Sequence, residues 1–324
     1  MPHAIRFYET GGPEVLRWEE VQVGSPGKGE VRLRHTAVGL NFIDVYHRSG
    51  LYPVSLPATP GLEACGVVEE VGEGVTELKP GDRVAYASPP LGAYAEERLM
   101  PADRVVKVPE GISDQQAASM MLKGMTAEYL VRRTFRLGSE HTILVHAAAG
   151  GVGLILCQWA RALGATVIGT VGSDEKARLA EAHGCQYPIV YTREDFVARV
   201  LDITGGHKCD VVYDSVGKDT FMRSLDCLRM FGTLVSFGQS SGPVPPFDVG
   251  VLSAKGSLYL TRPTLMHYTA RREDLVMSAN ALFQMVLDGK IRIEINQTYP
   301  LEEAARAHRD LQGRKTTGST VLLV

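Results

Sequence analysis

A glycine-rich turn is the clearest sign of chemistry in this sequence. Residues 146–153 read HAAAGGVG and lie between an apolar segment and an amphipathic one. Small residues at a turn from a strand into a helix let backbone amides approach a pyrophosphate, and the helix dipole favours its negative charge. Ala148, Gly150 and Gly153 occupy the three small-residue positions of a dinucleotide-binding turn, with Ala in place of the first Gly. The expected cofactor contacts here are Gly150, Gly151, Val152 and Gly153.

The choice of nicotinamide cofactor depends on the end of the next strand. A protein that binds NAD usually has an acid there, about twenty residues beyond the turn. Here the strand ends at Gly172 and Ser173, and Lys176 follows one helical turn later. A hydroxyl and an ammonium can hold a 2′-phosphate, which favours NADPH. Asp174 and Glu175 leave an alternative open, because a carboxylate could bind the ribose of NAD or simply favour the helix N-terminus.

The elements around the turn alternate between apolar strands and amphipathic helices, which predicts a parallel sheet. The helix after the turn is the clearest, with its apolar residues on one face and Gly164 placed to end it. The expected strands span 142–147, 166–171, 188–191, 210–214 and 233–237. Further helices are expected over 114–135 and 270–288, and a final strand over 320–324 that returns to the first domain.

The first part of the chain has a different texture. Up to about Lys123, short strands are broken by Gly and Pro, which is typical of a β-rich barrel or sandwich. Half-buried strands are indicated at 30–34 and 66–72. The fold class is therefore α/β, with a Rossmann doubly wound parallel sheet and a second, β-rich domain.

Composition excludes several classes of protein. The 324 residues are 44% hydrophobic and carry a formal charge of -3 without long runs of one sign, so neither nucleic acid nor a membrane surface is an expected partner. No stretch approaches the length of a membrane span and no secretory signal is apparent, which predicts a cytoplasmic location. The five cysteines are dispersed and the nine histidines form no cluster with them, so we expect reduced thiols and no zinc site.

Several further motifs combine with the glycine turn into a resemblance that runs nearly end to end. They lie at residues 11–16, 41–44, 48–53, 60–63, 81–84 and 214–217. With them the chain resembles the medium-chain dehydrogenase/reductase superfamily, and within it the bacterial NADPH:quinone oxidoreductases related to zeta-crystallin. The resemblance implies a GroES-like catalytic domain over 1–124, completed by 263–324, and a Rossmann NADPH-binding domain over 125–262. It also implies a homodimer, commonly formed through the Rossmann sheets, for which an edge strand at 256–260 is available.

The resemblance also bears on the reaction. Zinc-dependent relatives have a histidine ligand in a Gly-His-Glu segment, where this chain has Gly61, Leu62 and Glu63. The cysteine-rich loop of the structural zinc is missing too, so alcohol oxidation with a metal is not expected. A quinone needs no such metal, because its conjugated ring accepts hydride once it is held face-on to the nicotinamide.

The resemblance implies that Asn41, Tyr46 and Tyr52 are the catalytic residues, lining the cleft near the nicotinamide. Asn41 could instead cap the helix that starts at Phe42, and the two tyrosines could be packing residues. A tyrosine hydroxyl or solvent could protonate the quinone oxygen. Besides Asn41 and Tyr46, the implied cofactor contacts are Lys123 and Thr126 near the pyrophosphate or nicotinamide, then Tyr129, Leu130, Tyr191, Ser215, Phe237, Gly238, Ser240 and Arg314.

Simpler roles remain open for several of these residues. Tyr191 could be an ordinary tyrosine at a strand end, Arg314 a solvated charge beside Lys315, and the nearby Asp214 a structural acceptor. The function also has alternatives. One is reduction of an activated C=C bond in an enone or alkenal, and another is a binding protein that keeps the nucleotide fold without its chemistry, as crystallins or RNA-binding relatives do.

Overall fold

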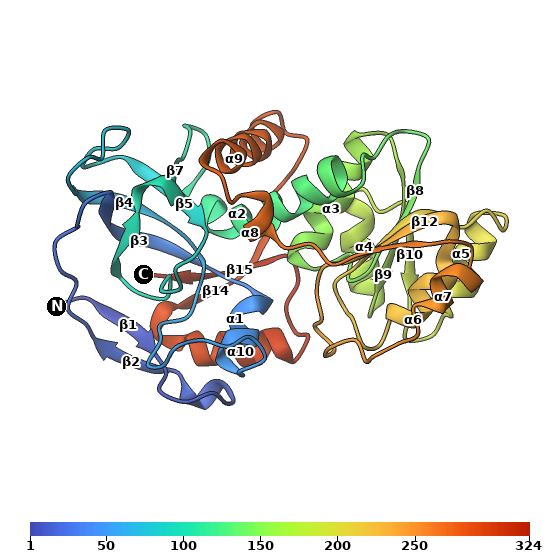
Figure 1. Cartoon of the computed structure of the whole chain (residues 1–324), viewed down its shortest axis with the longest axis horizontal. Helices are drawn as coiled ribbons and strands as arrows, with labels where there is room; N and C mark the ends of the chain where they lie inside the picture. The colour runs from blue at the N-terminus through green and yellow to red at the C-terminus, as the bar shows by residue number, and fades with distance from the viewer. The chain divides into compact units, whose positions relative to one another are not determined.

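The computed structural model describes every residue from Met1 to Val324 and divides into two compact units. Unit 1 contains Met1–Met125, Thr269–Leu287 and Ile293–Val324, and unit 2 contains Thr126–Tyr268 and Asp288–Arg292 (Figure 1). The chain is therefore a β-rich unit made of distant segments and a unit in which strands and helices alternate.

Unit 1 is built on a seven-stranded sheet with the order β14-β15-β3-β4-β5-β7, in which β6 also pairs with β3. Strands β1 (His3–Arg6) and β2 (Arg17–Glu20) form a separate antiparallel pair. The strands of the large sheet are β3 (Glu30–Leu40), β4 (Glu63–Val71), β5 (Arg83–Ala87), β6 (Glu97–Pro101), β7 (Val106–Lys107), β14 (Ile295–Pro300) and β15 (Ser319–Leu323). Their inward residues, among them Leu33, Tyr86 and Met100, form one apolar core.

The chain end completes unit 1, as the sequence predicts. Strand β15 lies antiparallel to β3, with Thr320 opposite Leu40 and Leu323 opposite Ala37. The helical segments of this unit are η1 (Pro13–Val15), α1 (Phe42–Arg48), η2 (Ala102–Arg104), the start of α2 (Asp114–Tyr129), α9 (Arg272–Leu287), η5 (Leu301–Glu303) and α10 (Ala304–Gln312). The helix expected over 114–135 ends as α2 at Tyr129 and continues as a π-helical turn, η3 (Leu130–Thr134).

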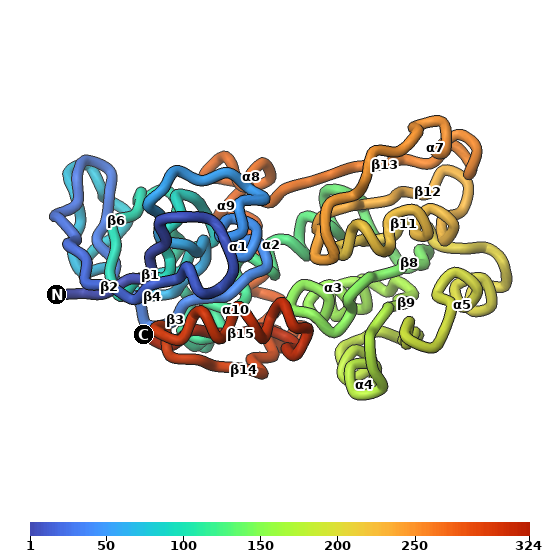
Figure 2. The backbone as a smooth tube through the Cα atoms, turned by 90° about the horizontal axis from the view of Figure 1, so that it is seen from below, coloured from blue at the N-terminus to red at the C-terminus, as the bar shows by residue number.

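Unit 2 contains the predicted parallel sheet, with the order β10-β9-β8-β11-β12-β13. Numbered along the chain this is 3-2-1-4-5-6, the order of a Rossmann fold, and it reverses between β8 and β11. Figure 2 shows β13, β12, β11, β8 and β9 side by side in this order. The strands are β8 (Thr142–Val145), β9 (Thr166–Val171), β10 (Tyr187–Val190), β11 (Cys209–Asp214), β12 (Leu228–Ser236) and β13 (Tyr259–Thr261).

Among the five strands predicted for this sheet, two ends differ from the prediction by more than one residue, each for a local reason. Strand β8 stops at Val145 instead of 147, since Ala147 has a φ of 55°, which turns the chain out of the extended conformation. Strand β12 starts at Leu228 instead of 233 because its first residues pair with β11 through an irregular register, although Arg229, Met230 and Phe231 are exposed. An exposed, irregular start leaves no periodic pattern to detect.

The remaining elements of unit 2 are α3 (Gly151–Ala162), α4 (Asp174–Ala182), α5 (Phe196–Ile203), α6 (Phe221–Ser224), η4 (Leu225–Cys227), α7 (Gly250–Ala254) and α8 (Leu265–Tyr268). Helix α3 buries the face that its periodicity predicts, including Ile155, Leu156 and Trp159. It ends before Gly164, whose φ of 89° suits the left-handed position after a helix. The glycine turn thus lies between a buried strand and a well-packed helix.

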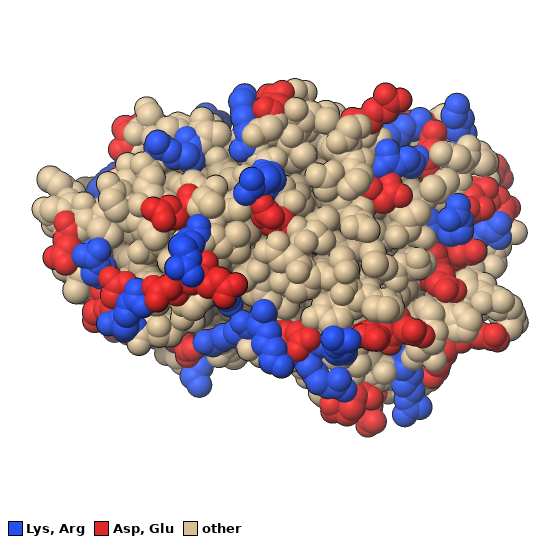
Figure 3. Space-filling view, turned by 180° about the vertical axis from the view of Figure 1, so that it is seen from behind, with Lys and Arg blue, Asp and Glu red and all other residues tan.

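Charges of both signs are mixed on the surface, and the thiols are buried. On the face shown in Figure 3, basic and acidic groups are interspersed without a stripe of one sign. All five cysteines are free and buried. None of the helices combines the length and the apolar character needed to cross a bilayer.

Candidate functional site

The glycine turn presents backbone donors at the start of α3. Gly150 is the N-cap residue and makes no side-chain cap, and the first N–H groups of a helix have no partners within it. Gly153 must be glycine, because a Cβ there would overlap the carbonyl oxygen of Ala147. The helix can therefore begin directly against the turn. This arrangement fits a pyrophosphate, which needs unhindered N–H groups at a helix N-terminus.

A buried polar chain supports the turn from below. His146, the residue before the turn, has Nδ1 2.8 Å from Thr170 Oγ1 and Nε2 2.9 Å from Ser224 Oγ. Ser224 in turn donates to Asp214 Oδ2 over 2.9 Å. Burial lowers the pKa of His146, which favours the neutral imidazole. Since the Ser224 hydroxyl donates to Asp214, its oxygen is free to accept from the Nε2–H tautomer. The chain ties the ends of β8, β9 and β11 together.

Asp214 is a structural acceptor. Its Oδ1 accepts from the backbone N–H groups of Val216 and Gly217 at 2.8 and 3.0 Å, and from the Thr220 hydroxyl. These bonds shape the loop that starts at Ser215. The predicted cofactor residues Ser215, Phe237, Gly238 and Ser240 meet here, because Ser240 N–H donates to Ser215 O and a Cβ on Gly238 would lie 2.6 Å from that oxygen. They adjoin the carboxyl ends of β11 and β12.

The end of β9 carries the group predicted to bind the 2′-phosphate. Ser173 is the N-cap of α4, and its hydroxyl accepts from Lys176 N–H. A Cβ on Gly172 would lie 3.1 Å from the Tyr191 hydroxyl, so these two predicted residues are neighbours. Tyr191 is 42% exposed, which leaves its ring available to a ligand.

Arg193 also belongs to this group, although the sequence analysis missed it. Its guanidinium binds both carboxylate oxygens of Asp174, at 2.8 and 2.5 Å. Asp174, which the sequence left open as a possible ligand of the ribose, is thus already paired with a cation. A signal was present, since Arg193 follows the third strand just as Lys176 follows the second.

Three predicted cofactor residues on α2 and η3 pack inside the protein. Thr126 and Tyr129 are buried, and the Tyr129 ring stacks on Tyr268 with centroids 4.2 Å apart. Leu130 is fully buried and its carbonyl accepts from the Tyr213 hydroxyl. Their cofactor contacts stay predictions, as does that of Arg314, which follows α10 in an exposed turn of unit 1 with a φ of 58°.

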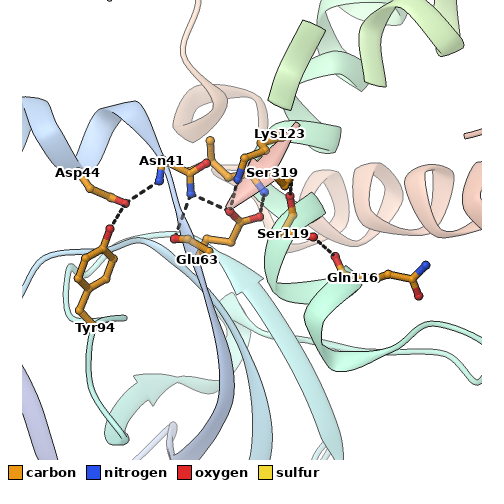
Figure 4. Close-up of polar contacts among 10 residues, drawn as sticks. Asn41, Asp44, Glu63, Tyr94, Gln116, Ser119, Lys123 and Ser319 are labelled. Atoms are coloured by element: carbon orange, nitrogen blue, oxygen red, sulfur yellow. Dashed lines mark hydrogen bonds and ion pairs between the residues drawn. The ribbon is translucent and has the colours of Figure 1, made fainter. Parts of the chain in front are cut away.

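A cluster of buried charges in unit 1 surrounds Glu63, which has no exposed surface (Figure 4). Its carboxylate accepts from the Asn41 side-chain amide at 2.7 Å, from Leu122 N–H at 2.7 Å and from the Lys123 ammonium at 3.2 Å. Asn41 is the N-cap residue of α1 and forms a capping box with Asp44, as its cap role in the sequence analysis predicts, and its side-chain NH₂ group also binds Glu63. Two predicted site residues, Asn41 and Lys123, are thus held by an acid that was not predicted.

Close packing of β3 against α2 makes this cluster possible. A Cβ on Gly39 would overlap both the Ala118 carbonyl oxygen and the Glu63 carboxylate. The start of α2 is also tied to the chain end, since Ser319 donates to the Ser119 carbonyl over 3.1 Å. Figure 4 shows this bond beside the Glu63 cluster. Lys123 therefore reaches Glu63 from a helix that is fixed on two sides.

A second buried chain holds α1. Asp44 Oδ2 accepts from Asn41 N–H and from the Tyr94 hydroxyl, both at 2.9 Å. The Tyr94 hydroxyl also meets His308 Nε2 at 3.1 Å, and His308 Nδ1 lies 3.0 Å from the Arg48 guanidinium. Asp44 Oδ1 is buried without a hydrogen-bond partner. Burial raises the pKa of Asp44 to about 7, in spite of the opposing effects of Asn41, Tyr94 and Lys123.

Helix α1 also places the two predicted catalytic tyrosines together. The Tyr46 and Tyr52 rings meet edge to face with centroids 5.2 Å apart, and Tyr52 N–H donates to the Tyr46 carbonyl. Tyr46 is buried and Tyr52 is half-buried. Aromatic packing is thus part of their role, and contact with a ligand stays a prediction.

Two family matches cover most of the chain. Residues 27–110 match the family "Alcohol dehydrogenase GroES-like domain", and residues 151–276 match "Zinc-binding dehydrogenase". A quinone oxidoreductase of Pseudomonas aeruginosa is 56% identical over 324 residues, with all of both chains covered. The chain belongs to the quinone oxidoreductase family of medium-chain dehydrogenases/reductases. This confirms the fold class and the resemblance seen in the sequence.

Two further proteins are similar to this chain over nearly its whole length. The solved structure of Escherichia coli quinone oxidoreductase complexed with NADPH superimposes with a TM-score of 0.98, at 49% identity, over 99% of this chain and all of that one. A 2-haloacrylate reductase of Burkholderia sp is 49% identical over 330 residues, which cover all of this chain and 99% of that protein. The name of this second relative refers to a different acceptor.

The zinc in the name of one family match can be compared with the residues present. Leu62 stands in the segment where zinc-dependent relatives have histidine, and its buried side chain has no ligand atom. No group of three or more His, Cys, Asp or Glu side chains lies close enough together to hold a metal ion. The residues of this quinone oxidoreductase family member therefore do not fit a metal, and its metal independence stays a prediction.

The buried Asp44 makes a prediction about stability. Its folded pKa of about 7 lies above the ordinary 3.8, so the folded state holds an extra proton between these values and stability falls as pH rises from about 4 to about 7. Asn mimics the neutral carboxylic acid at every pH, so Asp44→Asn should remove this fall in stability with rising pH. Urea unfolding should show that the free energy of unfolding of the variant, relative to wild type, is higher at pH 8 than at pH 5 by at most about 3 kcal/mol, since about two pKa units separate pH 5 from the folded pKa of Asp44.

The difference between variant and wild type separates Asp44 from the buried histidines, which titrate in both proteins. Asp310→Asn is the matched control, because the Tyr299 hydroxyl lowers the pKa of Asp310 and its contribution is lost as pH falls. Equal pH dependence in Asp44→Asn and wild type would show that Asp44 is ionised throughout.

Proposed function

We propose that this protein uses NADPH to reduce a quinone. The observation that carries the proposal is the free helix N-terminus at the glycine turn, in a sheet of Rossmann order, in a chain 49% identical to a quinone oxidoreductase solved with NADPH. When bound, NADPH supplies a hydride, which is two electrons and one hydrogen. The chain must bind this cofactor, orient the acceptor against it and exclude water.

Each end of the cofactor has its own set of residues in this proposal. The N–H groups of Gly151, Val152 and Gly153 bind the pyrophosphate, and Ser215, Phe237, Gly238 and Ser240 line the path beside it. Gly172, Ser173, Lys176 and Tyr191 hold the 2′-phosphate, with Arg193 added from the structure. The nicotinamide end of the cofactor lies beside Asn41, Tyr46 and Lys123 in this proposal, and Tyr52 helps to enclose the acceptor there. Thr126, Tyr129, Leu130 and Arg314 keep their proposed cofactor contacts.

Activated alkenes form a second class of possible acceptors, because a 2-haloacrylate reductase and the solved quinone oxidoreductase have the same sequence identity to this chain, 49%. Haloacrylates, enones and quinones share one feature. In each, the carbon that takes the hydride is conjugated to a carbonyl or carboxylate oxygen, and the negative charge moves to that oxygen. Quinones remain our first choice since most of the similar proteins carry that name.

The proposal predicts rapid oxidation of NADPH when benzoquinones or naphthoquinones are added. Loss of absorbance at the nicotinamide band measures the rate, and product analysis with an enone and 2-chloroacrylate tests the second acceptor class. Turnover with these alkenes but with no quinone would make the protein a double-bond reductase. Binding of NADPH without turnover of any acceptor would favour the nucleotide-fold binding protein.

The 2′-phosphate group predicts the coenzyme preference. The double variant Ser173→Ala/Lys176→Met should raise KM for NADPH about 10- to 100-fold, since charge-assisted hydrogen bonds contribute about 1.5–3 kcal/mol each, while KM for NADH changes little. Arg161→Met, on the exposed last turn of α3, is the matched control and should leave both values unchanged. Equal increases for NADPH and NADH would place the 2′-phosphate elsewhere.

A homodimer through the Rossmann sheet stays part of the proposal. Strand β13 is the edge of that sheet, and beside it Met230, Phe231 and Tyr259 are 63%, 56% and 62% exposed. Phe231 N–H donates to the Gly256 carbonyl, so these side chains belong to one surface. A second copy related by a two-fold axis could add its own β13 and cover this apolar patch. A cytoplasmic location also stays a prediction.

The dimer proposal predicts the effect of charge on this patch. The double variant Phe231→Arg/Tyr259→Arg should shift the mass measured by light scattering from two chains to one, because four like charges would meet across the axis. Tyr187→Arg, on exposed strand β10 at the opposite edge of the sheet, is the control. A wild-type mass of one chain would contradict the dimer.

A further inference from the structure

The buried ammonium of Lys123 has hydrogen bonds left to make. Its side chain is 7% exposed, and its contact with Glu63 Oε2 at 3.2 Å uses one of its three N–H donors. The other two point to no acceptor within the protein. Buried donors without acceptors are costly, so a ligand oxygen or water must complete this shell.

The neighbours of Lys123 cannot take these bonds. An amide accepts only through its oxygen, and the Asn41 side chain already accepts from the Asp44 N–H in the capping box of α1, while its NH₂ group donates to Glu63 and to the Gly39 carbonyl at 2.7 and 3.4 Å. Glu63 has both oxygens occupied, by Asn41 and Lys123 on one side and by Leu122 N–H on the other. Figure 4 shows the bonds that Glu63 accepts from Asn41 and Lys123, and the structure contains no second acceptor for the ammonium.

The ammonium is also held in place. Lys123 lies on α2, whose start is bonded to β15 through Ser119 and Ser319. Its ammonium is held by the Glu63 carboxylate, which is fully buried and also accepts from Asn41 and Leu122 N–H. Donors that are fixed before the reaction stabilise developing negative charge without reorganisation. A mobile surface lysine would lose this advantage to water.

We propose that Lys123 is a catalytic residue, donating hydrogen bonds to the oxygen of the conjugated acceptor as negative charge develops there. This inference rests on the proposed function and names the feature that its substrates share. The acceptor carbon gains a C–H bond as the C–H bond that carried the hydride on the nicotinamide breaks, which would leave NADP⁺, and the π electrons move to the conjugated oxygen. This oxyanion takes a proton from water, and in an enone or haloacrylate the resulting enol then returns that hydrogen to carbon as the carbonyl or carboxyl group re-forms. Lys123 keeps all three of its protons throughout.

The proposal explains which acceptors depend on the ammonium. A quinone of high reduction potential accepts hydride readily, so it needs little stabilisation at its oxygen. An enone or a haloacrylate is less reactive, and the charge on its oxygen must be stabilised more. Loss of Lys123 should therefore slow weak acceptors more than strong ones.

The test compares Lys123→Met/Glu63→Gln with wild type. Lys123→Met alone would leave a buried carboxylate uncompensated and could fail to fold, and the double variant removes both charges while Gln keeps an acceptor for Leu122 N–H. Single-turnover hydride transfer at saturating NADPH should fall about 100-fold with an enone and about 10-fold or less with a benzoquinone, in the range for loss of one preorganised donor. The NADPH dissociation constant, from fluorescence titration, should stay within about threefold.

Lys107→Met is the matched control, because this exposed lysine of unit 1 also pairs with an acid, Asp82, at 2.9 Å. It should leave every rate unchanged. Hydride transfer at the wild-type rate in the double variant would mean that Lys123 only neutralises Glu63. A weakened affinity for NADPH with unchanged hydride transfer would place the ammonium on the cofactor instead. Either result overturns the proposal.

A probe that needs no turnover separates this inference from the proposed function. 4-Nitrophenol carries an aromatic oxyanion when ionised, and a fixed ammonium should lower the pKa of the bound phenol by about one unit. Absorbance titration with NADP⁺ present should show this lowering in wild type and lose it in Lys123→Met/Glu63→Gln. The same titration curve in both proteins would contradict the role of Lys123, even if quinone reduction is confirmed.

Discussion

The buried carboxylate of Glu63 is the constraint on which unit 1 depends. A carboxylate without exposed surface requires donors from the protein, because water cannot supply them. Glu63 collects these donors from two further segments, the N-terminus of α1 through Asn41 and the middle of α2 through Leu122 and Lys123. The position of every one of these residues is therefore set by one acid on β4.

In unit 2 the main requirement is a fixed backbone at the glycine turn. A pyrophosphate is bound by backbone N–H groups, so the residues of the turn contribute by being small, as Gly153 does. What the turn needs is a fixed backbone, and the chain from Thr170 through His146 and Ser224 to Asp214 supplies it. These polar groups are buried and fully paired, which makes the arrangement specific. The glycine turn is thus held by a hydrogen-bonded chain that ends at the Asp214 carboxylate, and the Glu63 cluster is held by a buried ion pair.

This contrast explains how much could be predicted from the sequence. The parallel sheet, helix α3 and the return of β15 follow from apolar periodicity, which is a local signal. The pairing of Glu63 with Lys123 joins residues sixty positions apart and leaves no local pattern. Arg193 could have been predicted from its place after the third strand, but its pairing with Asp174 joins two different strand ends and leaves no local pattern. The π-helical turn at Leu130–Thr134 was predicted as plain helix because both have similar periodicity.

Leu62, next to the Glu63 cluster, bears on which acceptors the protein can reduce. Leu62 offers no ligand atom, and beside it Glu63 binds an ammonium. A metal ion carries two charges and polarises even an isolated carbonyl, whereas one ammonium paired with a carboxylate contributes a much weaker field. Such a site can assist only acceptors that already spread charge through conjugation. Quinones, enones and haloacrylates meet this condition and simple ketones do not, so the same cluster that holds the fold together would also limit the chemistry to conjugated acceptors.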